Sequence, residues 1–290
     1  MEFIPTQRQT SEKTTKHIYK MSSTQQRLIS AFVIISILAL CIWKGVIPSK
    51  VLSFIFGLLI CEELFTNFFK IKRFSSDYFL SLLAYVAIIV FDSFFVTSLN
   101  IESLWLNITL VSAFITCGML GLLLLNIPTI SSKNLFEKIS PISLAFFVLV
   151  IFRIIDHMSF PYALIGLLIL VSSADAGAWF FGKNFGKNPL WKSVSPNKTR
   201  EGAIAGIICT SLFMTIYWKW VFPTSSYSIA LFFIILAIVS ILGDLVQSKL
   251  KRLYSIKDSS SMIPGHGGFF DRADSILFTA PFYLLLIKLL

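Results

Sequence analysis

Residues 228–246 read SIALFFIILAIVSILGDLV, an apolar run in which Asp244 is the only charged residue. A helix needs roughly 17–25 predominantly apolar residues to cross the hydrocarbon core of a bilayer. This run is long enough, and it continues directly into a polar segment that begins at Gln247. The sequence therefore predicts a transmembrane helix whose polar end carries a carboxylate.

Similar apolar runs recur along the chain, which has 290 residues, 56% of them hydrophobic and 14% charged. A soluble domain of this size could not bury so much apolar surface. We therefore expect an all-α fold, a polytopic transmembrane helical bundle of about nine spans that forms one domain over 28–290. The expected spans are 28–43, 51–69, 78–97, 104–125, 141–157, 161–181, 202–222, 228–246 and 275–289.

The loops expected on one side of the membrane hold 20 of the 25 Lys and Arg residues. These segments are 1–27, 70–77, 126–140, 182–201 and 247–274. Cytosolic loops carry such an excess of Lys and Arg, so this side is predicted to face the cytosol. The formal charge of +10 then indicates orientation in the membrane rather than a nucleic-acid partner.

Residues 1–27 are polar and lack periodicity, so we expect a flexible cytosolic arm. No small-residue cleavage site follows the first apolar run, which is therefore expected to stay as the first span. The cysteines all lie within apolar runs and form neither a C-x-x-C pair nor a Cys/His cluster, so neither zinc nor a disulfide framework is indicated. They are Cys41, Cys61, Cys117 and Cys209.

The last cytosolic loop combines carboxylates and cations. Asp244 and Ser248 are four residues apart at the end of a span, and Lys251 continues the same helical face. Asp271 and Asp274 are three residues apart, so they share a face if the final helix begins just before them. The alternative for these two aspartates is that they cap that helix and complement its dipole.

Three glycines, Gly265, Gly267 and Gly268, precede the final helix. A backbone without Cβ can approach a ligand closely, and the N–H groups at a helix start can bind phosphate. Carboxylates that point toward one another near a membrane are costly unless a cation joins them. Oxygen ligands beside a phosphate-binding loop are typical of Mg²⁺.

Carboxylates within spans are candidates for function, because charge inside a membrane is costly. Asp175 is such a candidate. It lies within a predicted span, and the polar loop that follows this span ends in the stretch Ser195–Gly202. Glu201 at the end of that segment either serves the site or helps the next helix to begin. Of the adjacent Glu62 and Glu63, one is expected to be functional and the other to pair or reach the interface. No role is assigned to two others, Asp92 and Asp156.

At these residues the chain resembles a known family. The run S-x-L-K-R-x4-K-D-x-S-x2-I-P-G-H-G-G-F-x-D-R-x-D from Ser248 to Asp274 looks like the signature of phosphatidate cytidylyltransferases, also called CDP-diglyceride synthetases. The blocks D-x-G-A-W-F-F-G-K and S-P-N-K-T-x-E-G, between Asp175 and Gly202, resemble a second conserved region of that family. Ala176 stands where the family usually has Thr or Ser, and Ala273 where it has a larger residue. Neither departure removes a charge.

The resemblance implies that CTP and phosphatidic acid are converted to CDP-diacylglycerol and pyrophosphate with Mg²⁺, and a second cation is left open. It also implies a homodimer, with a polar cavity that opens to the cytosol and to the lipid. A bacterial plasma membrane is the expected location, with the site in residues 175–274. Site residues are then expected as metal ligands (Asp244, Asp271, Asp274), as catalytic and phosphate-binding groups (Asp175, Lys198, Lys251, Arg252, Lys257, His266, Arg272) and as substrate-binding residues (Ser195, Thr199, Glu201, Ser248, Gly265, Gly267, Gly268).

Two other functions fit parts of this pattern. A CTP-dependent kinase of a membrane lipid alcohol would transfer the γ-phosphoryl group and would need a base for the hydroxyl. A transporter for an anionic solute would be expected to contain repeated halves with broken helices, and no internal repeat is visible. The D-G-x2-A-R … G-x3-D-x3-D pattern of CDP-alcohol phosphotransferases is absent.

Overall fold

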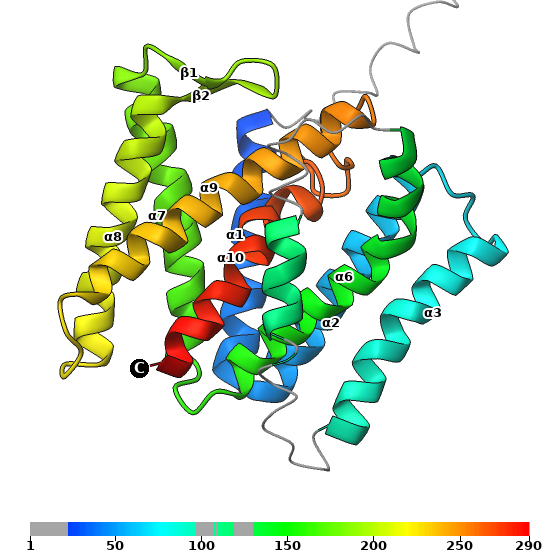
Figure 1. Cartoon of the computed structure of the whole chain (residues 1–290), viewed down its shortest axis with the longest axis horizontal. Coiled ribbons are helices and arrows are strands. Elements are labelled where there is room, and N and C mark those ends of the chain that lie inside the picture. Colours follow the sequence, from blue (N-terminus) through cyan, green and yellow to red (C-terminus); the bar gives the residue numbers. More distant parts are fainter. Residues whose placement is uncertain (1–22, 97–106, 108, 119–129, 290) are drawn as a thin grey trace, which may run out of the picture.

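The computed structural model describes residues 23–96, 107, 109–118 and 130–289, and in this part of the chain helices predominate (Figure 1). Short π-helical turns extend α2 and α3, at Leu64–Phe68 and Asp92–Val96. The helices are α1 (Ser23–Lys44), α2 (Val46–Glu63), α3 (Ser76–Phe91), α6 (Ile130–Asp156), α7 (Tyr162–Phe185), α8 (Arg200–Val221), α9 (Ile229–Leu253) and α10 (Phe270–Leu289).

Seven of these helices, α1 to α3 and α6 to α9, are long and apolar enough to cross a membrane. The helix α10 has 20 residues and contains the predicted span 275–289. A shorter apolar helix, Thr109–Gly118, falls within the predicted span 104–125, and the rest of that span lies outside the described residues. The predicted polytopic helical membrane fold is confirmed, and the protein is an integral membrane protein.

Three helix boundaries differ from the prediction. The helix α1 begins at Ser23, so a flexible arm is wrong for 23–27, while residues 1–22 lie outside the described part. The helix α7 continues to Phe185, and α9 continues to Leu253, well beyond the predicted end at residue 246. Lys and Arg are good helix formers and favour a helix C-terminus, so the basic residues extend α9 rather than end it.

The segment between α7 and α8 contains an antiparallel hairpin of β1 (Pro189–Trp191) and β2 (Ser195–Thr199), which the all-α prediction did not include. Small residues allow the two flanking helices to approach closely. A Cβ at Gly206 would lie 2.7 Å from the Ala174 carbonyl oxygen, and one at Gly202 would lie 2.6 Å from that of Ala178. This close packing brings the polar end of α7 beside the hairpin.

The helix α6 lies at the centre of the bundle, with 78% of its span buried. Its Arg153 forms a buried ion pair with Asp92 of the turn after α3, and Asp156 lies 2.6 Å from Lys50 of α2. Charges inside a membrane are stable only when they are paired. The two aspartates without a predicted role therefore join α2, α3 and α6.

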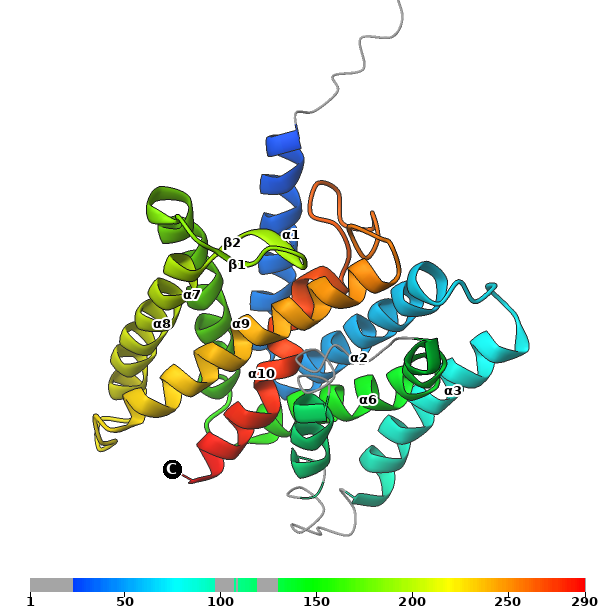
Figure 2. The ribbon, with the colours of Figure 1, turned by 45° about the horizontal axis from the view of Figure 1, so that its top comes forward.

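The basic segments come together at one end of the bundle, as Figure 2 shows for the start of α1, the hairpin and the loop between α9 and α10. Arg27 Nε donates to the Gly265 carbonyl oxygen at 2.9 Å. Asn67 Nδ2, beyond α2, donates to the Ser259 carbonyl oxygen at 2.8 Å. These contacts bring the start of α1 and the end of α2 to the loop between α9 and α10, at the same end of the bundle.

Labelling in intact cells tests this arrangement. In a background without the native cysteines, Ser193→Cys and Ser261→Cys should resist a membrane-impermeant thiol reagent, because positive loops face the cytosol. Thr224→Cys, which is also exposed but lies between α8 and α9, should react. Labelling of Ser193→Cys and Ser261→Cys from outside, with protection of Thr224→Cys, would reverse the predicted orientation.

Candidate active site

Three carboxylates from three helices lie within electrostatic range of one lysine. Lys198 of β2 forms an ion pair with Asp244 of α9. Asp175 of α7 and Asp274 of α10 both lie within electrostatic range of Asp244 and Lys198. Asp274 is buried, and its Oδ1 accepts a hydrogen bond from the Ser275 N–H at 2.7 Å. We call these four residues, Asp175, Lys198, Asp244 and Asp274, the carboxylate cluster.

The charge of the carboxylate cluster is unbalanced, since one lysine faces three carboxylates when all are ionised. Carboxylate oxygens are the ligands that Mg²⁺ prefers, and Mg²⁺ usually takes only one or two of them together with substrate phosphates. Among the described residues, no three His, Cys, Asp or Glu side chains lie close enough to hold one metal ion. By the ligand preference of Mg²⁺, the carboxylates of the cluster fit an ion that phosphate oxygens help to bind.

A cavity of about 500 Å³ lies beside the carboxylate cluster and includes Asp175, Lys198 and Asp244 in its wall. Apolar side chains from α7, β1 and α9 form part of the same wall, including Trp179, which is 65% exposed. This cavity, which we call the hairpin cavity, combines charged groups with apolar surface, and such a combination suits a ligand that has an ionic head and an apolar body.

Asp271 lies at the start of α10 and is held by a different set of donors. Its Oδ1 accepts hydrogen bonds from Gln247 Nε2 at 3.0 Å and from Lys251 Nζ at 2.9 Å. Its Oδ2 accepts from the Ser259 N–H and hydroxyl, at 2.9 and 3.0 Å, and from the Gly268 N–H at 3.1 Å. Asp271 thus fastens the end of α9, the following loop and the start of α10 to one another.

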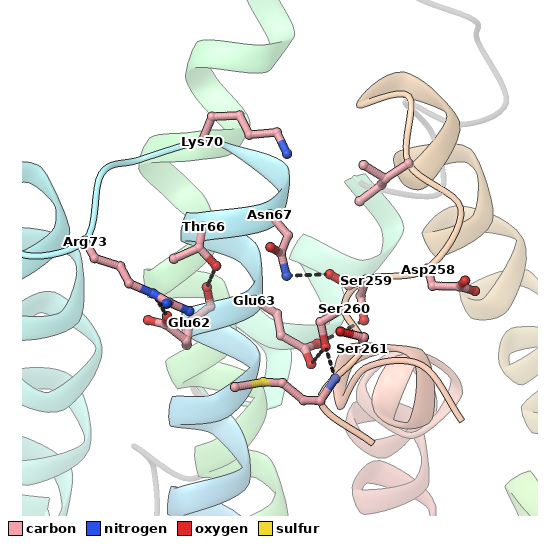
Figure 3. Close-up of a pocket in the computed structure, with 12 residues that line it drawn as sticks. Glu62, Glu63, Thr66, Asn67, Lys70, Arg73, Asp258, Ser259, Ser260 and Ser261 are labelled. Atoms are coloured by element: carbon pink, nitrogen blue, oxygen red, sulfur yellow. Dashed lines mark hydrogen bonds and ion pairs between the residues drawn. The ribbon is translucent and has the colours of Figure 1, made fainter. Parts of the chain in front are cut away.

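Glu63, the last residue of α2, supports the same loop and lies beside Ser259 and Ser260 (Figure 3). It is 1% exposed and accepts four hydrogen bonds. The hydroxyls of Ser259 and Ser260 donate to it at 3.0 and 2.6 Å, and the N–H groups of Phe269 and Phe270 donate at 2.7 and 2.9 Å. The carboxylate therefore caps α10, where it also complements the helix dipole.

The neighbouring Glu62 has a different environment. It lies 2.7 Å from Arg73 Nε and accepts a hydrogen bond from the Tyr78 hydroxyl at 2.5 Å. One of the two adjacent glutamates thus pairs, as predicted, while the other, Glu63, is buried against the loop between α9 and α10. Glu63 was outside the predicted site residues, and the only signal in the sequence was an acidic pair within an apolar span.

The glycine loop has the backbone conformations that only glycine adopts easily. Gly265 and Gly267 have φ of 74° and 84°. A Cβ at Gly268 would lie 1.9 Å from Ser259 Oγ and 2.6 Å from the Glu63 carboxylate oxygens. The glycines are therefore required for the close approach of the loop to the carboxylates that hold it.

His266 lies at the tip of the glycine loop. Its Nδ1 is 2.7 Å from Ser30 Oγ of α1, and its carbonyl oxygen accepts a hydrogen bond from Arg272 Nη2 at 2.6 Å. Desolvation, followed by the positive charges of Arg272 and Arg27, lowers the pKa of His266 below its ordinary value. The His266 side chain connects the loop to α1 through its contact with Ser30.

A second cavity, of about 690 Å³, lies between the glycine loop and the start of α1. We call it the glycine-loop cavity. Its wall contains three predicted site residues with a basic side chain and two of the glycines. It also contains Arg27, which was not a predicted site residue. The predicted residues in this wall are Lys257, His266, Arg272, Gly265 and Gly267.

Other predicted residues support the scaffold in this conformation. The Thr199 hydroxyl accepts a hydrogen bond from the Gly202 N–H at 3.2 Å and caps α8. The Glu201 carboxylate, in the first turn of α8, accepts from the backbone N–H groups of Lys187 and Asn188 and fastens the segment after α7 to the start of α8. Arg252 Nε donates to the Val194 carbonyl oxygen at 3.5 Å. Substrate binding by Thr199 and Glu201 and a catalytic role for Arg252 stay predictions.

Two predicted serines lie near the carboxylate cluster. The Ser248 hydroxyl is 3.5 Å from Asp244 Oδ1, as their spacing of one helical turn predicts. Ser195 lies in the wall of the hairpin cavity. The structure thus divides the predicted set into the carboxylate cluster, the Asp271 network and the glycine-loop cavity.

Comparison with known proteins identifies the family of this chain. A family model described as the cytidylyltransferase family matches residues 25–290. The chain belongs to the cytidylyltransferase family. It is 37% identical over 182 residues to the phosphatidate cytidylyltransferase of Bacillus subtilis (strain 168), an alignment that covers 59% of this chain and 67% of that protein.

Other bacterial relatives are similar over a shorter length. The phosphatidate cytidylyltransferase of Staphylococcus haemolyticus is 42% identical over 120 residues, which cover 41% of this chain and 46% of that protein. The enzyme of that name from Helicobacter pylori (strain ATCC 700392 / 26695) is 42% identical over 118 residues, with 41% and 44% covered. These two alignments thus cover less than half of this chain and less than half of each relative.

The buried Glu63 provides a stability test of this cytidylyltransferase. Glu63→Gln replaces one carboxylate oxygen with an NH₂ group. This group cannot accept hydrogen bonds, so some of the loop N–H and O–H groups that donate to Glu63 lose their acceptor. We expect a loss of about 1–3 kcal/mol of stability and a lower kcat, measured by thermal unfolding in detergent and by turnover. Glu62→Gln, at the partly exposed pair with Arg73, should have a smaller effect on both. Equal effects of the two substitutions would contradict the special role of Glu63.

Proposed function

We propose that this cytidylyltransferase transfers CMP from CTP to phosphatidic acid and forms CDP-diacylglycerol and pyrophosphate. The observation that carries the proposal is the carboxylate cluster beside a cavity that joins charged and apolar surface. A nucleotidyl transfer to a lipid phosphate requires a site for concentrated negative charge close to the bilayer. The names of the bacterial relatives agree with this substrate pair.

The reaction forms one bond and breaks one. A non-bridging oxygen of the phosphatidate phosphate attacks the α-phosphorus of CTP. The bond from the α-phosphorus to the oxygen that bridges to the β-phosphorus breaks, and pyrophosphate leaves with that electron pair. Because positioning and charge neutralisation supply most of the catalysis in such transfers, we assign phosphate binding to Lys198, Lys251, Lys257, Arg252 and Arg272.

No general base is needed for this attack. The second pKa of a phosphate monoester is near 6, so phosphatidate is largely a dianion at neutral pH and its nucleophilic oxygen is already free. His266 is therefore assigned a positioning role, in agreement with its contact to Ser30 and its lowered pKa. A lipid-alcohol kinase, by contrast, would need to remove a proton from a hydroxyl.

We assign the phosphatidate headgroup to the hairpin cavity. Lys198 and Lys183 supply positive charge there, and Trp179 and Ile241 supply apolar surface. Trp is favoured at membrane interfaces, where an apolar ring meets polar groups. The acyl chains would then remain in the bilayer while the phosphate reaches the carboxylate cluster.

The carboxylate cluster is also the proposed place for Mg²⁺, with Asp244 and Asp274 as ligands and Asp175 beside them. When bound, Mg²⁺ would offset the negative charge of the substrate phosphates. Asp271 was predicted as a third ligand, but five hydrogen bonds occupy its oxygens in this conformation. We therefore propose that Asp271 acts by orienting the glycine loop, and a second cation stays a prediction.

The proposed location is a bacterial plasma membrane, with the site on the cytosolic side, where CTP is available. The excess of basic residues at this end of the bundle supports that orientation. The homodimer implied by the family resemblance stays a prediction.

The position of the label in CTP distinguishes the possible activities. With purified protein, Mg²⁺ and phosphatidate, label on the α-phosphorus should enter the organic phase, and label on the γ-phosphorus should appear in pyrophosphate. Asp244→Asn should lower the rate on the order of 10²-fold or more, because the site loses a proposed ligand of the Mg²⁺ that would offset the charge of the reacting phosphates. Transfer of the γ-label to a lipid alcohol would instead identify a kinase and refute the proposal.

Magnesium dependence separates the two proposed roles of the aspartates. Asp274→Asn should raise the Mg²⁺ concentration for half-maximal rate by at least roughly tenfold, a loss that even outer-sphere partners cause. Asp271→Asn should lower kcat with little change in that concentration. A comparable Mg²⁺ shift in Asp271→Asn would instead make Asp271 a ligand, as its position in the sequence suggested.

A further inference from the structure

The cations around the glycine-loop cavity differ from the other cations of the site in their partners. Lys198 and Lys251 form ion pairs with aspartates. Among the described residues, Arg27, Lys257 and Arg272 form no ion pair, although all three lie in the wall of one cavity. Asp258 is the acidic residue in that wall, so the cavity has an excess of positive charge.

Arg27 reaches this cavity from the far end of the sequence. Its Nε donates to the Gly265 carbonyl oxygen at 2.9 Å, and the nearby Ser30 hydroxyl donates to the Pro264 carbonyl oxygen at 3.0 Å. None of the apolar window of α1 is buried inside the protein. The cytosolic end of α1 is therefore held against the loop by polar contacts, and these contacts direct the guanidinium of Arg27 to the cavity.

The chemistry of the glycine-loop cavity is that of a polyphosphate site. Arg presents several N–H donors in a geometry that suits phosphate, and each charge-assisted hydrogen bond is stronger than a neutral one. A volume of about 690 Å³ is sufficient for part of a nucleotide. The wall has few apolar side chains, in contrast to the hairpin cavity, and the two cavities share no residue.

We propose that the glycine-loop cavity binds the β- and γ-phosphates of CTP, and that Arg27 of α1 is one of the phosphate-binding residues. This inference rests on the proposed cytidylyl transfer. It adds a division of the site, in which the phosphates that leave as pyrophosphate occupy one cavity and the lipid phosphate occupies the other. Arg272 is in the wall of the glycine-loop cavity, and its positive charge also interacts with Asp175 of the carboxylate cluster. It therefore acts on both regions.

Steady-state kinetics of the full-length protein test the assignment. Arg27→Gln should raise the KM for CTP, and the inhibition constant of pyrophosphate against CTP, by about tenfold or more, the loss typical of a hydrogen bond to a charged group. The KM for phosphatidate should stay within about twofold. Lys187→Gln, which removes another exposed cation from the same side, should change none of these constants.

Two further variants separate binding from support of the loop. Ser30→Ala removes a contact between α1 and the loop but no charge, so it should lower kcat without the selective rise in KM for CTP. Arg27→Lys keeps the charge and should restore part of the CTP affinity. If Arg27 only fastened the loop, Ser30→Ala and Arg27→Gln would change the constants for both substrates alike, and the inference would be wrong.

Pyrophosphate binding gives a measurement that does not depend on turnover. Inorganic pyrophosphate should raise the unfolding temperature of the wild-type protein, and Arg27→Gln should weaken this effect about tenfold in concentration. A rise in KM for phosphatidate alone would assign the cavity to a lipid headgroup and overturn the proposal, as would unchanged pyrophosphate binding. A wild-type protein that binds pyrophosphate but transfers no α-label to lipid would refute the proposed function and leave the cavity assigned to polyphosphate.

Discussion

The Ser259 hydroxyl lies 3.0 Å from carboxylate oxygens of both Glu63 and Asp271, and the loop between α9 and α10 is organised around this convergence. A buried carboxylate is costly unless donors surround it. Backbone N–H groups and hydroxyls of the loop therefore close on the two acids, Gly268 leaves the necessary space, and α10 begins at a defined residue. The direction of α10 then brings Asp274 to the carboxylate cluster and Arg272 to the glycine-loop cavity.

Elsewhere in the bundle, charges form ion pairs with one another. Arg153 with Asp92, and Lys50 with Asp156, form pairs that neutralise each other within the helices. When its three acids are ionised, the carboxylate cluster has too few cations, and the glycine-loop cavity has too few anions. Unbalanced charge of both signs near the end of a membrane bundle is costly without ligands, and a metal with polyphosphate and lipid phosphate would balance both regions. This complementarity is the physical link between the fold and the proposed reaction.

The division of the site also explains the use of helices from both halves of the chain. The C-terminal motifs supply the carboxylates and the glycine loop, but α1 and α2 hold that loop through Arg27, Ser30 and Glu63. A membrane helix such as α1 has little hydrophobic drive to associate with its neighbours, since lipid is as apolar as its side chains. Polar contacts at the N-terminal end of α1 therefore determine where this helix meets the site.

The sequence alone determined the membrane fold, because apolar runs of span length have few other stable states. It also determined the pairing of Ser248 with Asp244, which are one helical turn apart. Only the tertiary structure decided which aspartates meet: Asp271 and Asp274 are three residues apart, yet one holds the loop and the other joins Asp175 and Asp244. Periodicity defines a face of one helix but not the rotation of that helix against its neighbours. Contacts such as Glu63 with Phe270 and Arg27 with Gly265 depend on that rotation, so a single sequence could not predict them.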